Sequence, residues 1–280
     1  INITSMQGLI DALQSIASYT TLEIMNDLDF NDVVSTLTTA ILIPTNGSST
    51  HLTSDITING NNHVIYNLDN ASVSTALFQF RYCQNVSIND LSLLNCHCTK
   101  SSTRLITTTV NYYIDFHNVV VQGRFYYVPF AYCRFYDSML TFDHCNTVLS
   151  GTSIYTRCWI KFIGCTSTSG STGIFNNADG CYFTGDYGYT SATPSKPLLS
   201  TINNCCVNVM FTIINSNALT TDNLFKYTSS TEYINIINSD KFSFAVPSTL
   251  QDTTMCKLVT DEQMKNAEYL AGIGFDIIPT

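Results

Sequence analysis

One cysteine and its neighbours recur at a nearly constant interval along this sequence. Four such cysteines follow one another at steps of about 24 residues, and a fifth lies two such steps earlier: Cys83, Cys133, Cys158, Cys181 and Cys205. A period of this length is typical of repeat proteins, in which each short repeat buries its apolar face by stacking on its neighbours. The chain is therefore predicted to be a single solenoid.

Short runs that alternate apolar and polar residues accompany these cysteines, at residues 86–88, 114–116, 140–142, 160–162, 207–209 and 234–236. Such alternation predicts strands with one buried and one exposed face. The interval between the cysteines accommodates three short parallel strands and three turns. We therefore expect an all-β fold, a single-stranded parallel β-helix, whose right hand follows from the usual chirality of parallel connections. Asn or Asp ends several of the strands, and we interpret these residues as a ladder of turns.

Both ends of the chain change to a helical pattern. Thr4-Ser5-Met6-Gln7 has the form of a capping box and precedes apolar residues at helical spacing. Thr260-Asp261-Glu262-Gln263 repeats this form and predicts a helix to about Leu270 that plugs the last rung. The expected organisation is one domain, with a capping helix in 1–20, the β-helix in 21–258, and a capping helix and tail in 259–280. Residues 31–55 and 186–197 are expected to be loops.

Charge and composition exclude several classes of function. The formal charge is −9 and the 12 basic residues are scattered, which argues against nucleic-acid binding. The longest nearly apolar run, residues 38–44, is far shorter than the roughly 20 residues that span a bilayer. Residues 1–13 lack the basic start of a signal peptide, and the 11 cysteines contain no CxxC pair. We therefore expect reduced, buried thiols in a protein assembled in a cytoplasm.

Segments at both ends resemble known β-helical proteins. Three segments are similar to the entry of pectate-lyase-like right-handed parallel β-helix proteins: the helix at Leu9-Ile10-Asp11-Ala12-Leu13, the run Leu22-Glu23-Ile24, and the predicted strand from Ile56 to Leu68 with its Asn-Gly-Asn-Asn-His centre. The segment from Leu258 to Met264, with Gly274-Phe275, resembles the close of β-helical virion proteins, the tail or head spikes and fibres of tailed phages of gut bacteria. The resemblance implies a right-handed β-helix in a virion protein.

Three aspartates are weak candidates for catalysis: Asp115, Asp143 and Asp179. Glycoside hydrolysis needs two carboxylates roughly 5–10 Å apart. Aligning Ile114 with Leu140 places Asp115 opposite Thr141, with Asp143 in an adjacent column. Arg134 and the other nearby arginines are interpreted as isolated, so the basic residue of a lyase has no match. No metal site or cofactor is expected, because the neighbouring cysteines and histidines of residues 96–98 and 144–145 point to opposite faces of a strand.

Aromatic residues are dense between residues 112 and 136. They occupy both odd and even positions, so some must face solvent and mark a binding surface. The predicted binding residues are Tyr112, Tyr113, Phe125, Tyr126, Tyr127, Phe135 and Tyr136.

These features favour a non-enzymatic structural component of a phage virion, such as a β-helical fibre, spike or head-decoration subunit. Its expected partners are further copies of itself, in a homo-oligomer such as a trimer, other virion proteins and host-surface glycan. Two alternatives stay open. The first is a polysaccharide-degrading or glycan-binding tailspike domain, and the second is a bacterial surface adhesin.

Overall fold

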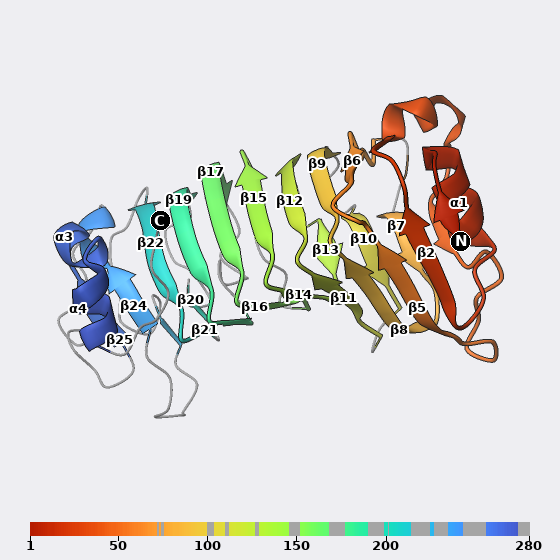
Figure 1. The fold of residues 1–280 in the computed structure, drawn as a ribbon. Helices are drawn as coiled ribbons and strands as arrows, with labels where there is room; N and C mark the ends of the chain where they lie inside the picture. The colour runs from red at the N-terminus through yellow and green to blue at the C-terminus, as the bar shows by residue number, and fades with distance from the viewer. Residues whose placement is uncertain are drawn as a thin grey trace. The chain divides into compact units, whose positions relative to one another are not determined.

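The structure is a computed structural model that describes residues 1–71, 73, 76–99, 104–109, 112–126, 129–145, 152–167, 177–189, 199–200, 202–213, 225–226, 235–242 and 256–273. The chain divides into two compact units. Unit 1 comprises residues 1–141 and 152–154, and unit 2 comprises residues 142–151 and 155–280. Each is described by itself below (Figure 1).

Unit 1 is built from parallel strands in three sheets. The first sheet contains, in spatial order, β1 (Asn2–Ile3), β2 (Thr20–Ile24), β5 (Thr53–Asn59), β8 (Cys83–Asn89), β11 (Ile114–His117) and β14 (Cys133–Tyr136). The second contains β4 (Ile41–Ile43), β7 (Ala76–Phe80), β10 (Arg104–Thr108) and β13 (Phe130–Ala131). The third contains β3 (Leu28–Asp29), β6 (Val64–Tyr66), β9 (Ser92–Cys98), β12 (Val120–Phe125) and the start of β15 (Met139–Asp143). Successive strands of one sheet come from successive rungs, which confirms the predicted all-β parallel β-helix.

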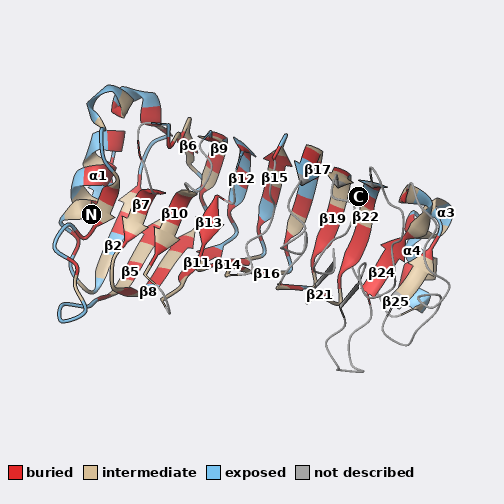
Figure 2. Ribbon diagram, turned by 180° about the vertical axis from the view of Figure 1, so that it is seen from behind, coloured by how far each residue is buried: buried red, intermediate tan, exposed pale blue. Residues whose placement is uncertain are grey.

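Alternation along each strand separates the core from the surface. The inward column of the first sheet is Leu22, Ile58, Ile88, Phe116 and Phe135, all buried and in register. Phe116 and Phe135 stack with ring centroids 4.7 Å apart. Figure 2 shows the resulting change between buried and less buried residues along the strands. Each of these stacks buries apolar surface that a single rung could not cover.

The rungs of unit 1 differ in length. Hydrogen bonds between the outward side chains of neighbouring rungs join Asn59 to Glu23, Asn89 to Asn59, Asn118 to Asp90 and Arg134 to Asp115. The sequence separations of these pairs are 36, 30, 28 and 19, in that order. Cys133 lies in register with Val86 through Ile114, not with Cys83. The interval from Cys83 to Cys133 is therefore not two equal steps, and the predicted uniform rung length was wrong for this unit.

Eight buried cysteines share one turn geometry, which explains their recurrence. Each follows a residue with positive φ, and each Sγ–H donates to the carbonyl two residues earlier: Cys83, Cys96, Cys133, Cys145, Cys158, Cys165, Cys181 and Cys205. Ser138 follows Asp137 in the same way and donates to the carbonyl of Tyr136 at 2.8 Å. Burial raises the pKa of Cys83, Cys96 and Cys206 to about 12, so these thiols stay protonated. The cysteines therefore act as buried donors that close turns.

Helix α1 (Met6–Gln14) packs Met6, Leu9, Ile10 and Leu13 into unit 1. Its N-cap is Ser5, which accepts a hydrogen bond from the Gly8 N–H at 3.1 Å, rather than Thr4 as the sequence pattern suggested. The prediction of a loop over 31–55 was wrong in part. The 3₁₀ helices η1 (Phe30–Asp32) and η2 (Val34–Thr36) and strand β4 occupy it, because the isoleucines of β4 fit the core of the second sheet.

Unit 2 continues the same construction. One sheet contains β17 (Trp159–Ser167), β19 (Tyr182–Tyr189), β22 (Cys206–Ile213), β24 (Asn235–Asn238) and β25 (Cys256–Val259). Another contains the last two residues of β16 (Ile154–Thr156), β18 (Ala178–Asp179) and β21 (Ile202–Asn203). Strand β20 (Leu199–Ser200) pairs with β23 (Phe225–Lys226). Residues 186–189, predicted as a loop, belong to β19, and residues 190–197 lie outside the described residues.

The C-terminal segment of unit 2 packs on the outward face of the β19–β22–β24 sheet. Phe183, Val207 and Ile237 form an inward column, so Tyr182, Cys206 and Ile236 must face outward. Those three residues are nevertheless buried, in a cluster with Met264 and Leu270. The predicted helical cap at the C-terminal end is present, but not as one continuous helix to about Leu270. Two short helices, α3 (Asp261–Met264) and α4 (Ala267–Gly272), cover the outside of the sheet.

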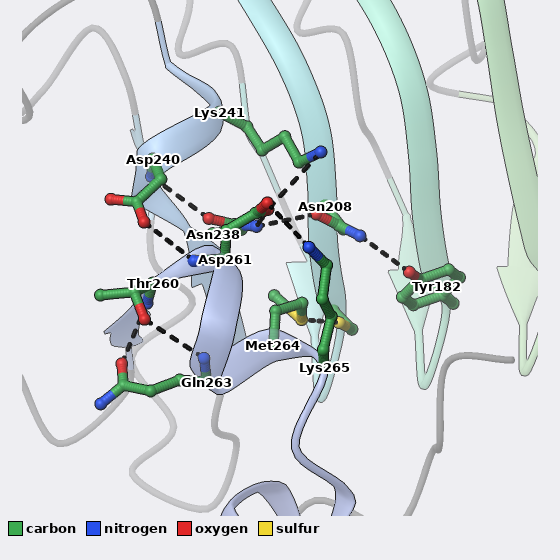
Figure 3. Close-up of polar contacts among 11 residues, drawn as sticks. Tyr182, Asn208, Asn238, Asp240, Lys241, Thr260, Asp261, Gln263, Met264 and Lys265 are labelled. Carbon is green, nitrogen blue, oxygen red and sulfur yellow. Dashed lines mark hydrogen bonds and ion pairs between the residues drawn. The ribbon is translucent and has the colours of Figure 1, made fainter.

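Polar contacts fix this segment, as Figure 3 shows. The predicted capping box is present, since Thr260 accepts from the Gln263 N–H and Gln263 accepts from the Thr260 N–H. Asn266 caps α4 and ends the first helix early. The buried amide of Asn238 donates to both Asn208 and Asp261, which ties η3 (Ser239–Lys241), α3 and β22 together.

Candidate binding face on strands β11 and β14

The candidate site lies on the outer face of the first sheet of unit 1. Phe116 and Phe135 point inward, so their neighbours on β11 and β14 point outward. The register places Asp115 beside Arg134 and His117 beside Tyr136. Backbone hydrogen bonds flank the pair, from Ile114 N–H to Tyr132 O at 3.2 Å and from Asn118 N–H to Tyr136 O at 3.1 Å. The four outward side chains are therefore held by a continuous ladder.

Asp115 and Arg134 form a two-pronged ion pair. Arg134 donates through Nε and Nη2 to the two carboxylate oxygens of Asp115, at 2.5 and 2.7 Å. The side chains are 36% exposed for Arg134 and 25% exposed for Asp115, so solvent screens this pair only in part. This geometry matches the planar fork of the guanidinium to the carboxylate. It also shows that the interpretation of Arg134 as isolated was wrong.

Aromatic rings surround the ion pair. The guanidinium of Arg134 lies 5.2 Å from the centre of the Tyr113 ring, a distance typical of cation–π contacts. Tyr113 meets Tyr132 edge to face at 6.2 Å, and His117 stacks on Tyr136 at 4.8 Å with ring planes 10° apart. We call the group of Tyr113, Asp115, His117, Tyr132, Arg134 and Tyr136 the aromatic cluster.

A polar ladder continues on the outer face toward the N-terminus. The amide of Asn89 donates to Asn59 at 3.1 Å, and the amide of Asn59 donates to Glu23 at 2.8 Å. Hydrogen bonds from Asn59 and Asn61 hold the pKa of Glu23 below its ordinary value. Asn89 is in register with His117, so this ladder ends at the aromatic cluster.

The structure places Asp115 differently from the sequence alignment. Ile114 pairs with Cys133, so Asp115 lies beside Arg134 rather than Thr141. The error arose because β11 and β15 belong to different sheets, although their patterns of alternation look alike. Both oxygens of the Asp115 carboxylate are engaged by Arg134, whereas glycoside hydrolysis needs two carboxylates that act directly on the substrate.

The other two aspartates are in unit 2. Asp143 contacts the imidazole of the adjacent His144, and Asp179 is exposed and accepts a hydrogen bond from Asn204 at 3.4 Å. Among the residues that the structure describes, no group of three or more His, Cys, Asp or Glu side chains is arranged to hold a metal ion. Within the same described ranges, no helix is sufficiently long and apolar to cross a membrane.

The predicted binding residues separate into several environments. Tyr113 and Tyr136 belong to the aromatic cluster, and Tyr112 is half-buried just before them. Phe125 and Phe135 are fully buried in the core, so they leave the candidate surface. Tyr126 is 49% exposed beyond the end of β12 in the third sheet, and Tyr127 lies outside the described residues.

Sequence reasoning did not assign His117, Tyr132 and Arg134 to the site. A signal was present, because residues 113–118 read Tyr-Ile-Asp-Phe-His-Asn and residues 132–137 read Tyr-Cys-Arg-Phe-Tyr-Asp. The step between these two segments is shorter than the interval that the cysteines suggested, so a search at the cysteine period passes over it. Their alignment gives the observed register directly.

Comparisons with known proteins give one structural likeness. No protein-family model matches the sequence, and no curated protein matches it. Among solved structures, a protein of Bacteroides ovatus that is provisionally described as an immunoglobulin A1 protease is similar, with 11% sequence identity and a TM-score of 0.39. The match covers 97% of this chain and 87% of that protein.

Proposed function

We propose that this chain is a non-enzymatic attachment protein that binds carbohydrate through the aromatic cluster. The observation that carries the proposal is the arrangement of tyrosine and histidine rings around a two-pronged Asp115–Arg134 pair on the outer face. Aromatic rings provide apolar faces for sugar C–H groups, and the ion pair provides donors and acceptors for sugar hydroxyls.

The parallel ladder supports this role because it fixes the site before a ligand arrives. The aromatic cluster comes from two adjacent strands whose inward side chains are fully buried. Binding to a preformed site avoids much of the free-energy cost of ordering side chains.

A glycan array probed with the labelled protein tests the proposal. The wild type should bind a subset of the glycans, and Tyr136→Ala should lose that signal because it removes the ring stacked on His117. Tyr126→Ala is the matched control, since this tyrosine is exposed but lies outside the aromatic cluster. Equal loss in both variants, or no binding by the wild type, would reject the proposal.

We further propose that this attachment serves a phage virion, with the chain as a fibre, spike or head-decoration subunit assembled in the host cytoplasm. The support is the resemblance of the C-terminal segment to the close of β-helical virion proteins, together with that of the N-terminal segment to the entry of pectate-lyase-like β-helix proteins. Such a subunit is expected to assemble as a homotrimer or another homo-oligomer and to contact other virion proteins. Light scattering on the purified chain tests the self-association, and a monomer at every concentration would count against it.

Polysaccharide cleavage is the competing proposal for the same surface. It requires two carboxylates that act directly on the substrate, and both carboxylate oxygens of Asp115 are already engaged by Arg134. Incubation with the glycans bound on the array, followed by mass spectrometry, separates the two proposals. Release of shorter glycans by the wild type, abolished in Asp115→Asn, would replace attachment by catalysis.

A further inference from the structure

We infer that the aromatic cluster selects neutral sugars over acidic ones, an inference that rests on the proposed carbohydrate binding. It concerns the two charged groups at the centre of the site. Both oxygens of Asp115 are engaged by Arg134, so the positive and negative charges compensate each other within the protein.

This pairing works against an acidic sugar. The carboxylate of a uronic or sialic acid would have to compete with Asp115 for the guanidinium of Arg134. Asp115 already holds it at 2.5 and 2.7 Å, and a second carboxylate placed there would be repelled by the first. The formal charge of −9 on the chain adds a weaker repulsion at long range.

The same pairing suits neutral hydroxyl groups. A guanidinium carries five N–H donors, of which Asp115 takes two, and a carboxylate offers about four acceptor positions. The pair therefore presents donors beside acceptors along one edge. Each sugar hydroxyl is both a donor and an acceptor, so two neighbouring hydroxyls of one ring can bridge the pair without disturbing it.

The rings define the rest of the site. Tyr113 lies under the guanidinium on one side, and the His117–Tyr136 stack lies one pleat further along the same strands. A sugar ring packed on the outer face of either ring of this stack would have its C–H groups on the aromatic surface and could turn its hydroxyls toward the ion pair.

The experiment compares neutral glycans with uronic- or sialic-acid-bearing glycans on the same array, at one fixed pH for all variants. The wild type should bind neutral glycans about tenfold or more tightly than acidic glycans of matched length. Asp115→Asn keeps the size of the side chain but leaves the charge of Arg134 uncompensated. This variant should lose affinity for the neutral set and gain about tenfold for the acidic set.

Arg134→Gln is the matched variant that removes the positive charge of the pair instead of the negative one. It leaves the Asp115 carboxylate uncompensated, so its binding of acidic glycans should stay weak. Circular dichroism is the control that checks whether both variants are folded. A wild type that prefers acidic glycans, or an Asp115→Asn variant with an unchanged preference, would overturn the inference while carbohydrate binding stands. A wild type that binds no glycan of either class would remove the proposed function itself.

Discussion

Asn235 tests how buried side-chain hydrogen bonds hold the turn at Ile202–Cys205 in unit 2. Its Oδ1 accepts from the Cys205 N–H at 3.0 Å, and its Nδ2 donates to the Ile202 carbonyl at 3.0 Å. All three residues are buried, with exposures of 7% or less. Asn235→Ala leaves two buried backbone groups without their partner, and each costs about 1–2 kcal/mol, the lower part of the range for an unsatisfied buried group. We therefore expect a loss of about 2–4 kcal/mol in the free energy of unfolding of unit 2.

Urea unfolding followed by tryptophan fluorescence measures this loss, because the single tryptophan, Trp159, lies in unit 2. With a slope of about 2 kcal/mol per molar urea, the midpoint should fall by about 1–2 M. Lys161→Ala is the control in the same unit, since Lys161 is exposed on β17, and its effect should stay within about 0.5 kcal/mol. Equal midpoints for the two variants would show that the Asn235 hydrogen bonds do not stabilise unit 2 as argued.

Three further predictions concern unit 2. Hydrogen bonds from Asn238 and then Lys265 lower the pKa of Asp261 in the folded protein. The charged Asp261 carboxylate therefore stabilises the fold above its ordinary pKa of 3.8, and this stabilisation is lost as the pH falls through the lower pKa of the folded state. Labelling of the underlying Cys206 with an acid-active thiol reagent should accelerate across that range in the wild type but not in Asp261→Asn. Cys158→Ser should lower the free energy of unfolding by about 1 kcal/mol or less in thermal denaturation, because a hydroxyl can donate to the Thr156 carbonyl as the thiol does. A larger loss of stability would contradict the turn geometry. Gly185→Ala should lower the free energy of unfolding by about 3 kcal/mol or more in the same assay, because Gly185 has φ +100° and a Cβ would collide with the backbone of Phe162. Wild-type stability of this variant would contradict the pairing of β17 with β19 at this position.

The elements that depend on local chemistry could be predicted from the sequence. Ser and Thr before apolar residues marked both helical ends, because capping is decided within one turn of helix. The inward residues of β8 and β11 followed from alternation, which is a property of any extended strand. The cysteines were predicted to be buried, and the ten whose burial the structure describes are buried.

The register between rungs could not be predicted from the same patterns. An alternating run looks the same in each sheet, so β11 was aligned with β15 rather than with β14. The turn conformations could not be predicted from the sequence either. Tyr82, Tyr132 and Arg157 adopt positive φ, which bulky residues rarely do, and only the buried cysteine that follows each one explains why the chain accepts the cost.

The position of the aromatic cluster follows from the shortest rung among the strands of the first sheet. Asp115 and Arg134 have the smallest sequence separation of the paired outward residues, and β12 and β13 take up much of the chain between them. The earlier rungs have more chain between their strands. A short rung brings two copies of one pattern into direct register, and the changes within that pattern, Asp115 to Arg134 and His117 to Tyr136, create the ion pair and the stack. The candidate site thus arises from two copies of one sequence pattern. The parallel register places the copies side by side, and the residue changes at two outward positions provide the ion pair and the aromatic stack.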